Sequence, residues 1–174
     1  VITGAFGGIG KSLALKFGKQ GANLVMWDVF IDQGFEKELS ADGVNFLSSK
    51  MDITVQGDVE NGLGAVMEKW NRVDILINNA GITRDNLILK MNEKDWDDVL
   101  NVNLKGAFIC SKIIGRVMFS KKSGRIVNVA SVIGQIGNIG QANYSASKGA
   151  LISLTKTCAR EFARFGVNVN AVAP

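Results

Sequence analysis

The sequence predicts an α/β fold built on a doubly wound parallel sheet. Short apolar runs alternate along the chain with amphipathic helical patterns, and this alternation is typical of β-α-β units. A glycine-rich turn, TGAFGGIG at residues 3–10, joins the first apolar run to the first helical pattern. The only proline is Pro174, so no helical pattern is interrupted by a residue that breaks helices.

Six apolar runs are predicted as strands, and a helical pattern follows each of the first five. The strands are predicted at residues 1–3, 22–27, 44–51, 73–78, 124–131 and 167–173. The helices are predicted at residues 8–20, 33–41, 59–70, 93–118 and 144–165, with a break in the fourth near residues 101–103. The run VDILIN is the clearest buried strand, and VNFLSSKM is the weakest. No linker, repeat or low-complexity segment divides this pattern, so we expect a single domain over residues 1–174.

The composition argues against several classes of function. The net charge of +4 is mild and its lysines and arginines are scattered, which does not favour a nucleic-acid binder. No run of about 18 uncharged apolar residues exists, so no membrane span is expected. Cys110 and Cys158 lie in apolar helical patterns without the spacing of a zinc site, so no metal site is predicted and a reducing compartment is favoured.

The expected location is therefore the cytoplasm. The chain opens on VITG, in the middle of a predicted strand, so its N-terminus is expected to be incomplete. A targeting segment, and with it an organelle matrix, stays open as an alternative.

The glycine-rich turn predicts a dinucleotide-binding site. Gly4 permits the tight turn, Gly8 lets the backbone approach a pyrophosphate, and Gly10 lets the helix pack on the strand. The start of the following helix offers free N–H groups and partial positive charge to the phosphates. The spacing is G-x3-G-x-G, which differs from the more general G-x-G-x-x-G fingerprint.

Tyr144 and Lys148 form the second candidate site, in a chain that contains no histidine. Residues four apart share one face of a helix, so the lysine charge can lie close to the phenol. A positive charge at about 4 Å favours the phenolate by several kcal/mol in a partly buried site. Tyr144 could then donate a proton in carbonyl reduction and accept one in alcohol oxidation. Ser131, at the end of a predicted strand, could hold the substrate oxygen. The alternative for Tyr144 and Lys148 is that they are an ordinary exposed pair of helix residues.

Together these motifs resemble the short-chain dehydrogenase/reductase family, whose signature includes T-G-x3-G-[IL]-G. The other matching motifs, in chain order, are Asn78-Asn79-Ala80-Gly81, Asn103 within NVNLKG, Ser131, Tyr144 with Lys148, and NAVAP at residues 170–174. The resemblance covers essentially the whole chain and implies a Rossmann fold. It also implies that the chain is incomplete at both ends, since the family's last strand and substrate lid follow the position of Pro174.

The resemblance assigns roles to individual residues. Lys148 would also bind the nicotinamide ribose, and Asn103 would hold a water in a proton relay, unless Asn103 only breaks or caps a helix. The predicted catalytic residues are Asn103, Ser131, Tyr144 and Lys148. The predicted cofactor-binding residues are Gly4, Gly8, Ile9, Gly10, Asp28, Asp52, Ile53, Asn79, Ala80, Gly81, Tyr144 and Lys148.

The end of the second predicted strand favours NAD(H) over NADP(H). Asp28 can accept hydrogen bonds from the ribose hydroxyls and would repel a 2′-phosphate. Members of the family that prefer NADPH often carry a basic residue just before the second motif glycine, where this chain has Gly7. NADP(H) stays possible.

Two further stretches resemble the 3-oxoacyl-[acyl-carrier-protein] reductases and the related acetoacetyl-CoA reductases. They are GITRDNLILKM at 81–91 and GNIGQANYSASKGAL at 137–151. This resemblance implies reduction of a 3-oxoacyl thioester. The usual donor of those enzymes is NADPH, from which Asp28 and Gly7 depart. A basic docking residue for the acyl carrier protein is matched at Lys122 but replaced by Phe165 at the other position.

Two other functions stay open. One is an NAD-dependent dehydrogenase of a 3-hydroxyacyl-CoA or of another secondary alcohol, and the other is a dinucleotide-binding protein without catalysis. The resemblance also implies a homotetramer formed through the helices around 104–120 and 145–165. These helices carry small residues on broad apolar faces, namely Gly106, Ala107, Ala146, Gly149 and Ala150.

Overall fold

The computed structural model describes residues 1–174, and a six-stranded parallel sheet forms its centre. The strand order is β3-β2-β1-β4-β5-β6. The strands are β1 (Ile2–Thr3), β2 (Leu24–Asp28), β3 (Phe46–Lys50), β4 (Ile75–Asn78), β5 (Gly124–Val129) and β6 (Val167–Val172). After β3 the chain crosses to the other side of β1, so the direction of winding reverses between β1 and β4. In such sheets, ligands bind at the carboxyl ends of the strands where this reversal occurs.

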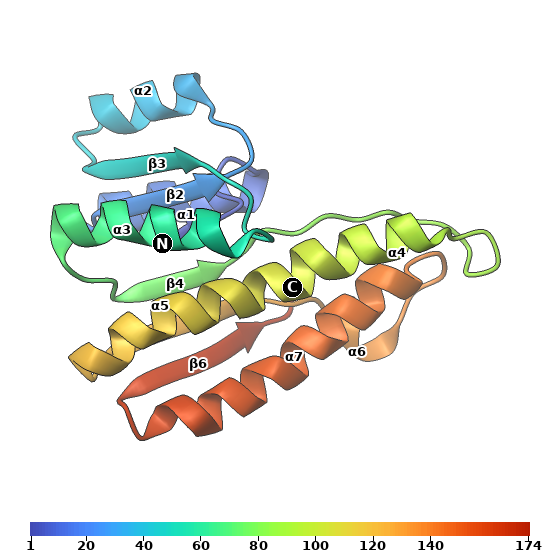
Figure 1. Cartoon of the computed structure of the whole chain (residues 1–174). Helices are drawn as coiled ribbons and strands as arrows, with labels where there is room; N and C mark the ends of the chain where they lie inside the picture. The colour runs from blue at the N-terminus through green and yellow to red at the C-terminus, as the bar shows by residue number, and fades with distance from the viewer.

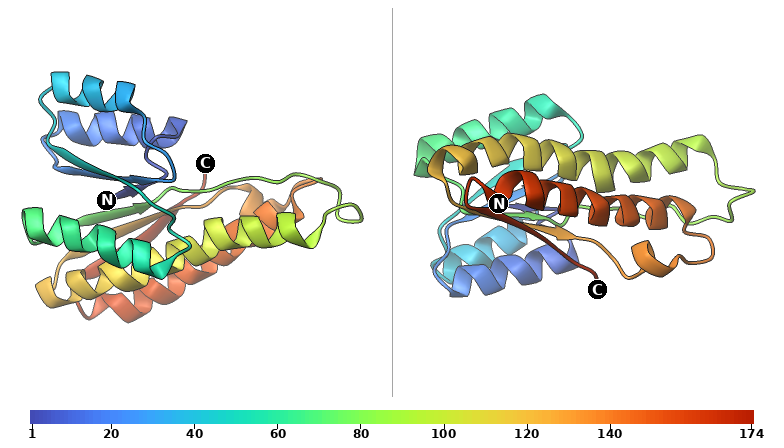
Figure 2. Two further views of the ribbon diagram at one scale, coloured as in Figure 1. Left: turned by 45° about the horizontal axis from the view of Figure 1, so that its top comes forward. Right: turned by 90° about the horizontal axis from the view of Figure 1, so that it is seen from below.

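Helices cover both faces of the sheet, as the sequence predicts. Figure 2 shows α1 and α2 on one face and α3, α5 and α7 on the other. The helices are α1 (Gly8–Lys19), α2 (Gln33–Ala41), α3 (Gln56–Trp70), α4 (Glu93–Leu100), α5 (Ala107–Lys121), α6 (Ile133–Ile136) and α7 (Ala142–Ala163). Helix α4, α6 and the start of α7 extend past the carboxyl end of the sheet, where a long segment joins β4 to α4 (Figure 1). None of these helices combines the length and the apolar character that crossing a bilayer would require.

Strand β2 explains how the two faces are filled. Side chains alternate between the faces of a strand. Leu24 and Met26 accordingly join the core under α1 and α2, whereas Val25 and Trp27 join the core under α3, α5 and α7. All four are buried. A central parallel strand is covered on both sides, and this is why the sequence shows an unbroken apolar run here.

The α-helix is interrupted where the sequence predicts a break, near residues 101–103, but the chain does not leave its helical path. Residues Asn101–Gly106 form a π-helix, η1, which joins α4 to α5 without interrupting the helical path. The backbone of Asn101, with φ −61° and ψ −49°, stays right-handed helical. Asn101 and Asn103 therefore mark a local widening of the helix rather than its end.

Helix α6 was not predicted at all. It is four residues long and begins two residues after Ser131, within a glycine-containing stretch that has the composition of a loop. It packs closely on α7 because Gly134 and Gly149 face each other: a Cβ added at Gly134 would lie 2.7 Å from the Gly149 nitrogen. Gly106 is likewise used inside the chain, since a Cβ there would lie 2.5 Å from Ile53. The small size of Gly106 and Gly149, which the resemblance assigned to a subunit interface, is therefore explained by contacts within the chain.

Candidate active site and dinucleotide cleft

The glycine-rich turn is shaped by two close contacts and one open position. Gly4 has φ +61°, and a Cβ there would lie 2.8 Å from the Cα of Ala80. A Cβ at Gly10 would lie 2.2 Å from the Gly4 carbonyl oxygen. Gly8 has no atom within 4 Å of its added Cβ, so its backbone faces open space at the first turn of α1. This open position beside a helix N-terminus suits a phosphate group.

The turn is bound to the end of β4 by the side chains of Thr3 and Asn79. The Thr3 hydroxyl accepts hydrogen bonds from the backbone N–H groups of Asn79 and Ala80, both at 3.1 Å. The Asn79 side-chain amide donates to the carbonyls of Thr3 and Gly4, both at 3.0 Å. The predicted motifs at residues 3–10 and 78–81 therefore form one continuous wall. Sequence reasoning missed the part that Thr3 plays in it.

A cleft of about 550 Å³ lies along this wall at the carboxyl ends of the strands. It brings together all the predicted cofactor residues outside α7 except Gly10, which is covered by the turn. Its lining also includes residues that were not predicted, namely Gly7, Trp27, Val29, Phe30, Met51, Ile82 and Val102. An extended cleft with an open helix N-terminus and a carboxylate at one side fits a dinucleotide.

Asp28 has a double role in this cleft. It ends β2 and is buried to 8% exposure. Its Oδ2 accepts a hydrogen bond from the Phe6 N–H at 2.9 Å, and its Oδ1 accepts one from the Val29 N–H at 2.8 Å. The carboxylate thus fixes the glycine-rich turn. It also lines the cleft, where each of its oxygens can accept a second hydrogen bond.

Tyr144 and Lys148 lie in the first turns of α7, as predicted. Tyr144 is half-buried, whereas Lys148 is only 3% exposed. The Lys148 Nζ donates a hydrogen bond to the Val129 carbonyl at 2.7 Å and lies 5.6 Å from the centre of the Tyr144 ring. Burial lowers the pKa of Lys148 from 10.5 to about 8. The ammonium is therefore desolvated and close to the phenol, where a positive charge acts most strongly.

Ser131 lies just beyond the end of β5, and α6 holds it in place. The Ser131 hydroxyl oxygen accepts a hydrogen bond from the Ile133 N–H at 3.2 Å, which leaves its own hydrogen free to donate. The Ile133 carbonyl in turn accepts a bond from the Ser145 hydroxyl on α7 at 3.1 Å. Ser131 is thus linked to the helix that carries Tyr144.

Asn103 belongs to η1 and is almost completely buried. Its Oδ1 accepts from the Ile82 N–H at 2.8 Å, and its Nδ2 donates to the Ile82 carbonyl at 3.0 Å and to the Ser147 hydroxyl at 3.1 Å. An added Cβ at Gly81 would lie 3.3 Å from Asn103 Oδ1 and 3.5 Å from Lys148 Nζ. The cleft wall, η1 and α7 therefore meet at Gly81. Both N–H groups of the Asn103 amide are used in joining them, and its Oδ1 can still accept a second bond.

Comparison with known proteins places this geometry among enzymes. The family model described as short chain dehydrogenase matches residues 1–174. The chain is 42% identical to 3-oxoacyl-[acyl-carrier-protein] reductase FabG of Staphylococcus epidermidis, over 100% of this chain and 72% of the relative. It is also 42% identical, with the same coverage, to 3-oxoacyl-[acyl-carrier-protein] reductase of Synechocystis sp..

Solved structures agree with these sequence relatives. A crystal structure of NAD+-bound xylitol dehydrogenase superposes with a TM-score of 0.96 at 34% identity, covering 99% of this chain and 68% of that one. The crystal structure of gox2181 superposes with the same TM-score at 32% identity, covering 99% and 69%. Fold and site thus define an oxidoreductase that uses a nicotinamide dinucleotide. The chain belongs to the short-chain dehydrogenase family.

The different surroundings of Gly8 and Gly10 predict opposite consequences of adding one methyl group. We expect Gly8→Ala to leave the stability within about 1 kcal/mol of wild type. Its methyl group would point into the cleft, so the Kd for NADH is expected to rise about tenfold or more, at about 1.4 kcal/mol per factor of ten. Gly10→Ala should instead destabilise the protein, because its Cβ would collide with the Gly4 carbonyl. Thermal unfolding and quenching of tryptophan fluorescence by NADH measure the two effects separately. Equal loss of stability in both variants would contradict this assignment.

Proposed function

We propose that this protein catalyses the NADH-dependent reduction of the 3-keto group of a 3-oxoacyl thioester, with Tyr144 as the general acid. The observation that carries the proposal is the buried Lys148 ammonium next to the Tyr144 ring and close to Gly81, which lines the cleft that fits a dinucleotide. The names of the two curated relatives support the substrate class.

Three side chains divide the proton chemistry between them. The free hydrogen of the Ser131 hydroxyl donates to the substrate keto oxygen and holds it in place. Tyr144 donates its phenolic proton to the same oxygen as the carbon is reduced. The Lys148 charge stabilises the phenolate that remains. When bound, the reduced nicotinamide supplies the hydride; Lys148 and Gly81 border the place where its ribose would lie.

Asp28 supports NADH as the preferred donor. The carboxylate is buried, ordered by two backbone N–H groups and open to the cleft. A 2′-phosphate beside it would bring two negative charges together in a partly desolvated site. Gly7, also in the cleft lining, offers no positive charge to offset them.

Replacing Asp28 with asparagine tests the cofactor preference. Asparagine keeps the size of the side chain and one oxygen for a backbone N–H, but it removes the charge. We expect the ratio of kcat/KM with NADPH to kcat/KM with NADH to rise about tenfold or more, which corresponds to about 1.4 kcal/mol. Steady-state rates with both donors measure the ratio. A ratio equal to that of wild type would reject the proposed role of Asp28.

The second candidate function is an NAD-dependent dehydrogenase of a 3-hydroxyacyl-CoA or of another secondary alcohol. The likeness to NAD+-bound xylitol dehydrogenase favours it, as does the acidic residue at position 28. Tyr144 would then accept the proton from the alcohol, since the same group serves both directions.

Turnover of acetoacetyl-CoA with NADH and NADPH, measured side by side by the loss of reduced-nicotinamide absorbance, tests the proposal. Faster oxidation of NADH supports both the thioester substrate and the role of Asp28. Faster oxidation of NADPH would reject the cofactor preference and keep the substrate class. No turnover, combined with oxidation of xylitol or 3-hydroxybutyryl-CoA by NAD+, would favour the second candidate function.

We also propose acyl carrier protein as a carrier of the substrate and a homotetramer as the assembly. Lys122, at the C-terminal end of α5, is the basic residue that supports carrier docking. Phe165 is uncharged and supplies no second positive charge; its ring stacks on Phe119 at 4.3 Å between ring centres. Light scattering of the purified protein and a comparison of acyl-CoA with acyl carrier protein substrates test these two points.

A further inference from the structure

The backbone of Tyr144 is held at both of its polar groups by neighbouring side chains. The Asn143 Oδ1 accepts a hydrogen bond from the Tyr144 N–H at 2.7 Å. The Ser147 hydroxyl donates to the Tyr144 carbonyl, also at 2.7 Å. Both side chains are completely buried. Neither residue is among the catalytic group of Asn103, Ser131, Tyr144 and Lys148.

Asn143 makes a hydrogen bond that the N-cap residue of a helix usually makes. The first N–H groups of a helix lack partners within it, and the side chain of the N-cap residue usually accepts one of them. The N-cap residue of α7, Gln141, makes no such bond. Its amide instead donates to the Asp85 carboxylate at 3.0 Å. Asn143 therefore satisfies the Tyr144 N–H from inside the first turn.

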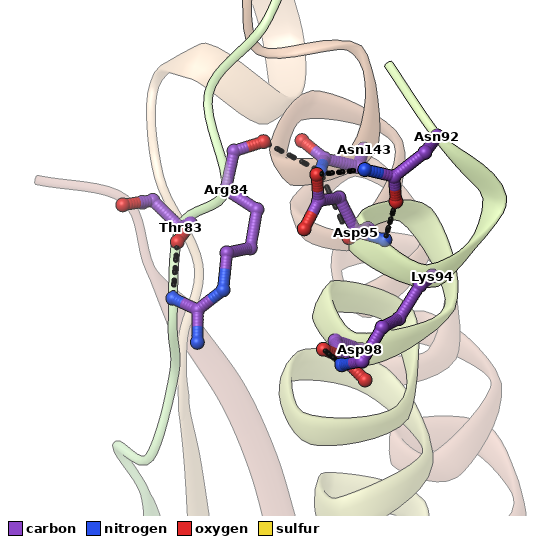
Figure 3. Close-up of polar contacts among 7 residues, drawn as sticks. All are labelled: Thr83, Arg84, Asn92, Lys94, Asp95, Asp98 and Asn143. Atoms are coloured by element: carbon purple, nitrogen blue, oxygen red, sulfur yellow. Dashed lines mark hydrogen bonds and ion pairs between the residues drawn. The ribbon is translucent and has the colours of Figure 1, made fainter.

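The remaining atoms of Asn143 connect Tyr144 to two distant segments. Its Nδ2 donates to the Arg84 carbonyl at 2.9 Å and to the Asp95 carbonyl at 3.1 Å. Figure 3 shows Asn143 between these two segments. Since the amide uses its acceptor and both of its donors, its orientation is fully determined.

The α4 side of this contact is held by hydrogen bonds within its own first turn. Asn92 caps the helix by accepting a hydrogen bond from the Asp95 N–H at 2.7 Å. Its Nδ2 also donates to the Asp95 carboxylate at 2.7 Å. Lys94 and Asp98 add an ion pair across the next turn (Figure 3). Asn143 thus joins Tyr144 to a helix start that is also held by hydrogen bonds of its own.

Ser147 completes the connection through Asn103. The Asn103 Nδ2 donates to the Ser147 hydroxyl, and the same amide group bonds both polar backbone groups of Ile82. The short segment Ile82–Arg84 is therefore bound at one end by Asn103 and at the other by Asn143. This segment directly follows Gly81 in the wall of the cleft.

We propose that Asn143 and Ser147 are positioning residues, which fix Tyr144 relative to the cleft wall by bonding its backbone to the segment Ile82–Arg84. The inference rests on the proposed role of Tyr144 as the general acid. A misplacement of about 1 Å can reduce a rate about 100-fold, so two bonds that define the position of the reacting residue affect kcat. They have little effect on how tightly the cofactor or the substrate binds.

The test compares Asn143→Ala and Ser147→Ala with two matched controls. Asn92→Ala removes the side-chain cap of α4, next to the same contact, but leaves both hydrogen bonds to the Tyr144 backbone intact. Ser120→Ala removes a hydroxyl that, like that of Ser147, donates to the carbonyl three residues earlier, at 2.8 Å in α5. Each variant is measured for thermal unfolding, NADH Kd, and kcat and KM with acetoacetyl-CoA and NADH.

We expect kcat to fall by about tenfold to 100-fold in Asn143→Ala and by about tenfold in Ser147→Ala, with KM and the NADH Kd within about threefold of wild type. Asn92→Ala should unfold at a lower temperature and keep its kcat, and Ser120→Ala should match wild type. A lower unfolding temperature with unchanged kcat in Asn143→Ala and Ser147→Ala would overturn the proposal. If Asn143→Ala does not fold, Ser147→Ala decides alone, because alanine fills nearly the same space as serine.

Tyr144→Phe separates this proposal from the one on which it rests. If Tyr144→Phe keeps wild-type turnover, the role of Tyr144 fails, whatever the other variants do. If Tyr144→Phe is inactive while Asn143→Ala and Ser147→Ala are fully active, the positioning role fails and the general acid stands. If wild type reduces no 3-oxoacyl thioester, the same variants are compared with the alcohol that it oxidises.

Discussion

Replacing Tyr144 by phenylalanine is expected to lower kcat by about 1,000-fold, near the middle of the range for loss of a general acid. Phenylalanine keeps the aromatic ring at the start of α7 and removes only the hydroxyl that would donate the proton. The ring contact with Lys148 remains, so the fold and the NADH Kd should change little. Steady-state kinetics with acetoacetyl-CoA and NADH measure the loss. Fluorescence quenching by NADH measures cofactor binding.

The composition makes this variant informative, because Tyr144 is the only tyrosine in the chain. Ultraviolet difference absorbance of tyrosinate during a pH titration therefore reports a single group, and Tyr144→Phe provides the blank.

Lys148→Met is expected to have two opposite effects, a loss of activity and a gain in stability. The variant removes the charge that favours the phenolate, so kcat should fall at least about 100-fold. It also removes the cost of burying an ammonium. The shift of the Lys148 pKa from 10.5 to about 8 corresponds to about 3 kcal/mol. Loss of the hydrogen bond to the Val129 carbonyl offsets about 1 kcal/mol, so a net gain of about 2 kcal/mol near pH 7 is expected.

The gain should depend on pH in a defined direction. Between about pH 8 and 10.5 the unfolded chain holds a proton on Lys148 that the folded chain has released, so wild-type stability rises with pH across this window. Below it, both states are protonated and the cost of burial is constant. The advantage of Lys148→Met should therefore be largest below about pH 8, shrink as the pH rises and be lost before pH 10.5. Urea unfolding of both proteins at several pH values measures the difference; a variant less stable than wild type at pH 7 would contradict the expectation.

Most of the fold could be predicted because local chemistry and tertiary structure agree. Helix α2 has the predicted bounds, Gln33–Ala41, since Asp32 accepts the Phe35 N–H and marks its beginning. Helix α3 begins at Gln56, three residues earlier than predicted, because its N-cap residue Val55 makes no side-chain cap bond and gives no signal. Helix α6 escaped prediction because four residues are too few to show a helical period, and its position depends on the contact between Gly134 and α7.

The placement of the candidate site residues was predictable where they belong to one short motif. The glycine-rich turn, Asp28 and the pair Tyr144 and Lys148 lie where their spacing indicates. Asn143 was missed because its partners, the carbonyls of Arg84 and Asp95, are brought together only by the folded chain. No sequence pattern shows which buried amide will meet three separate segments. An unexplained amide directly before the predicted acid was the only available signal.

The π-helix η1 has a consequence for how this chain can change in evolution and design. A π-helical turn holds one more residue than the α-helical turn that it replaces, so it corresponds to a one-residue insertion that the helix has absorbed. Deleting one residue from η1 would let α4 and α5 merge into a regular helix while both keep about their present orientation. The turn that carries Asn103 would become narrower, and its side chain would lose the position from which it bonds Ile82 and Ser147. In this family member, a single-codon deletion is thus expected to disconnect the site while leaving a longer and more regular helix.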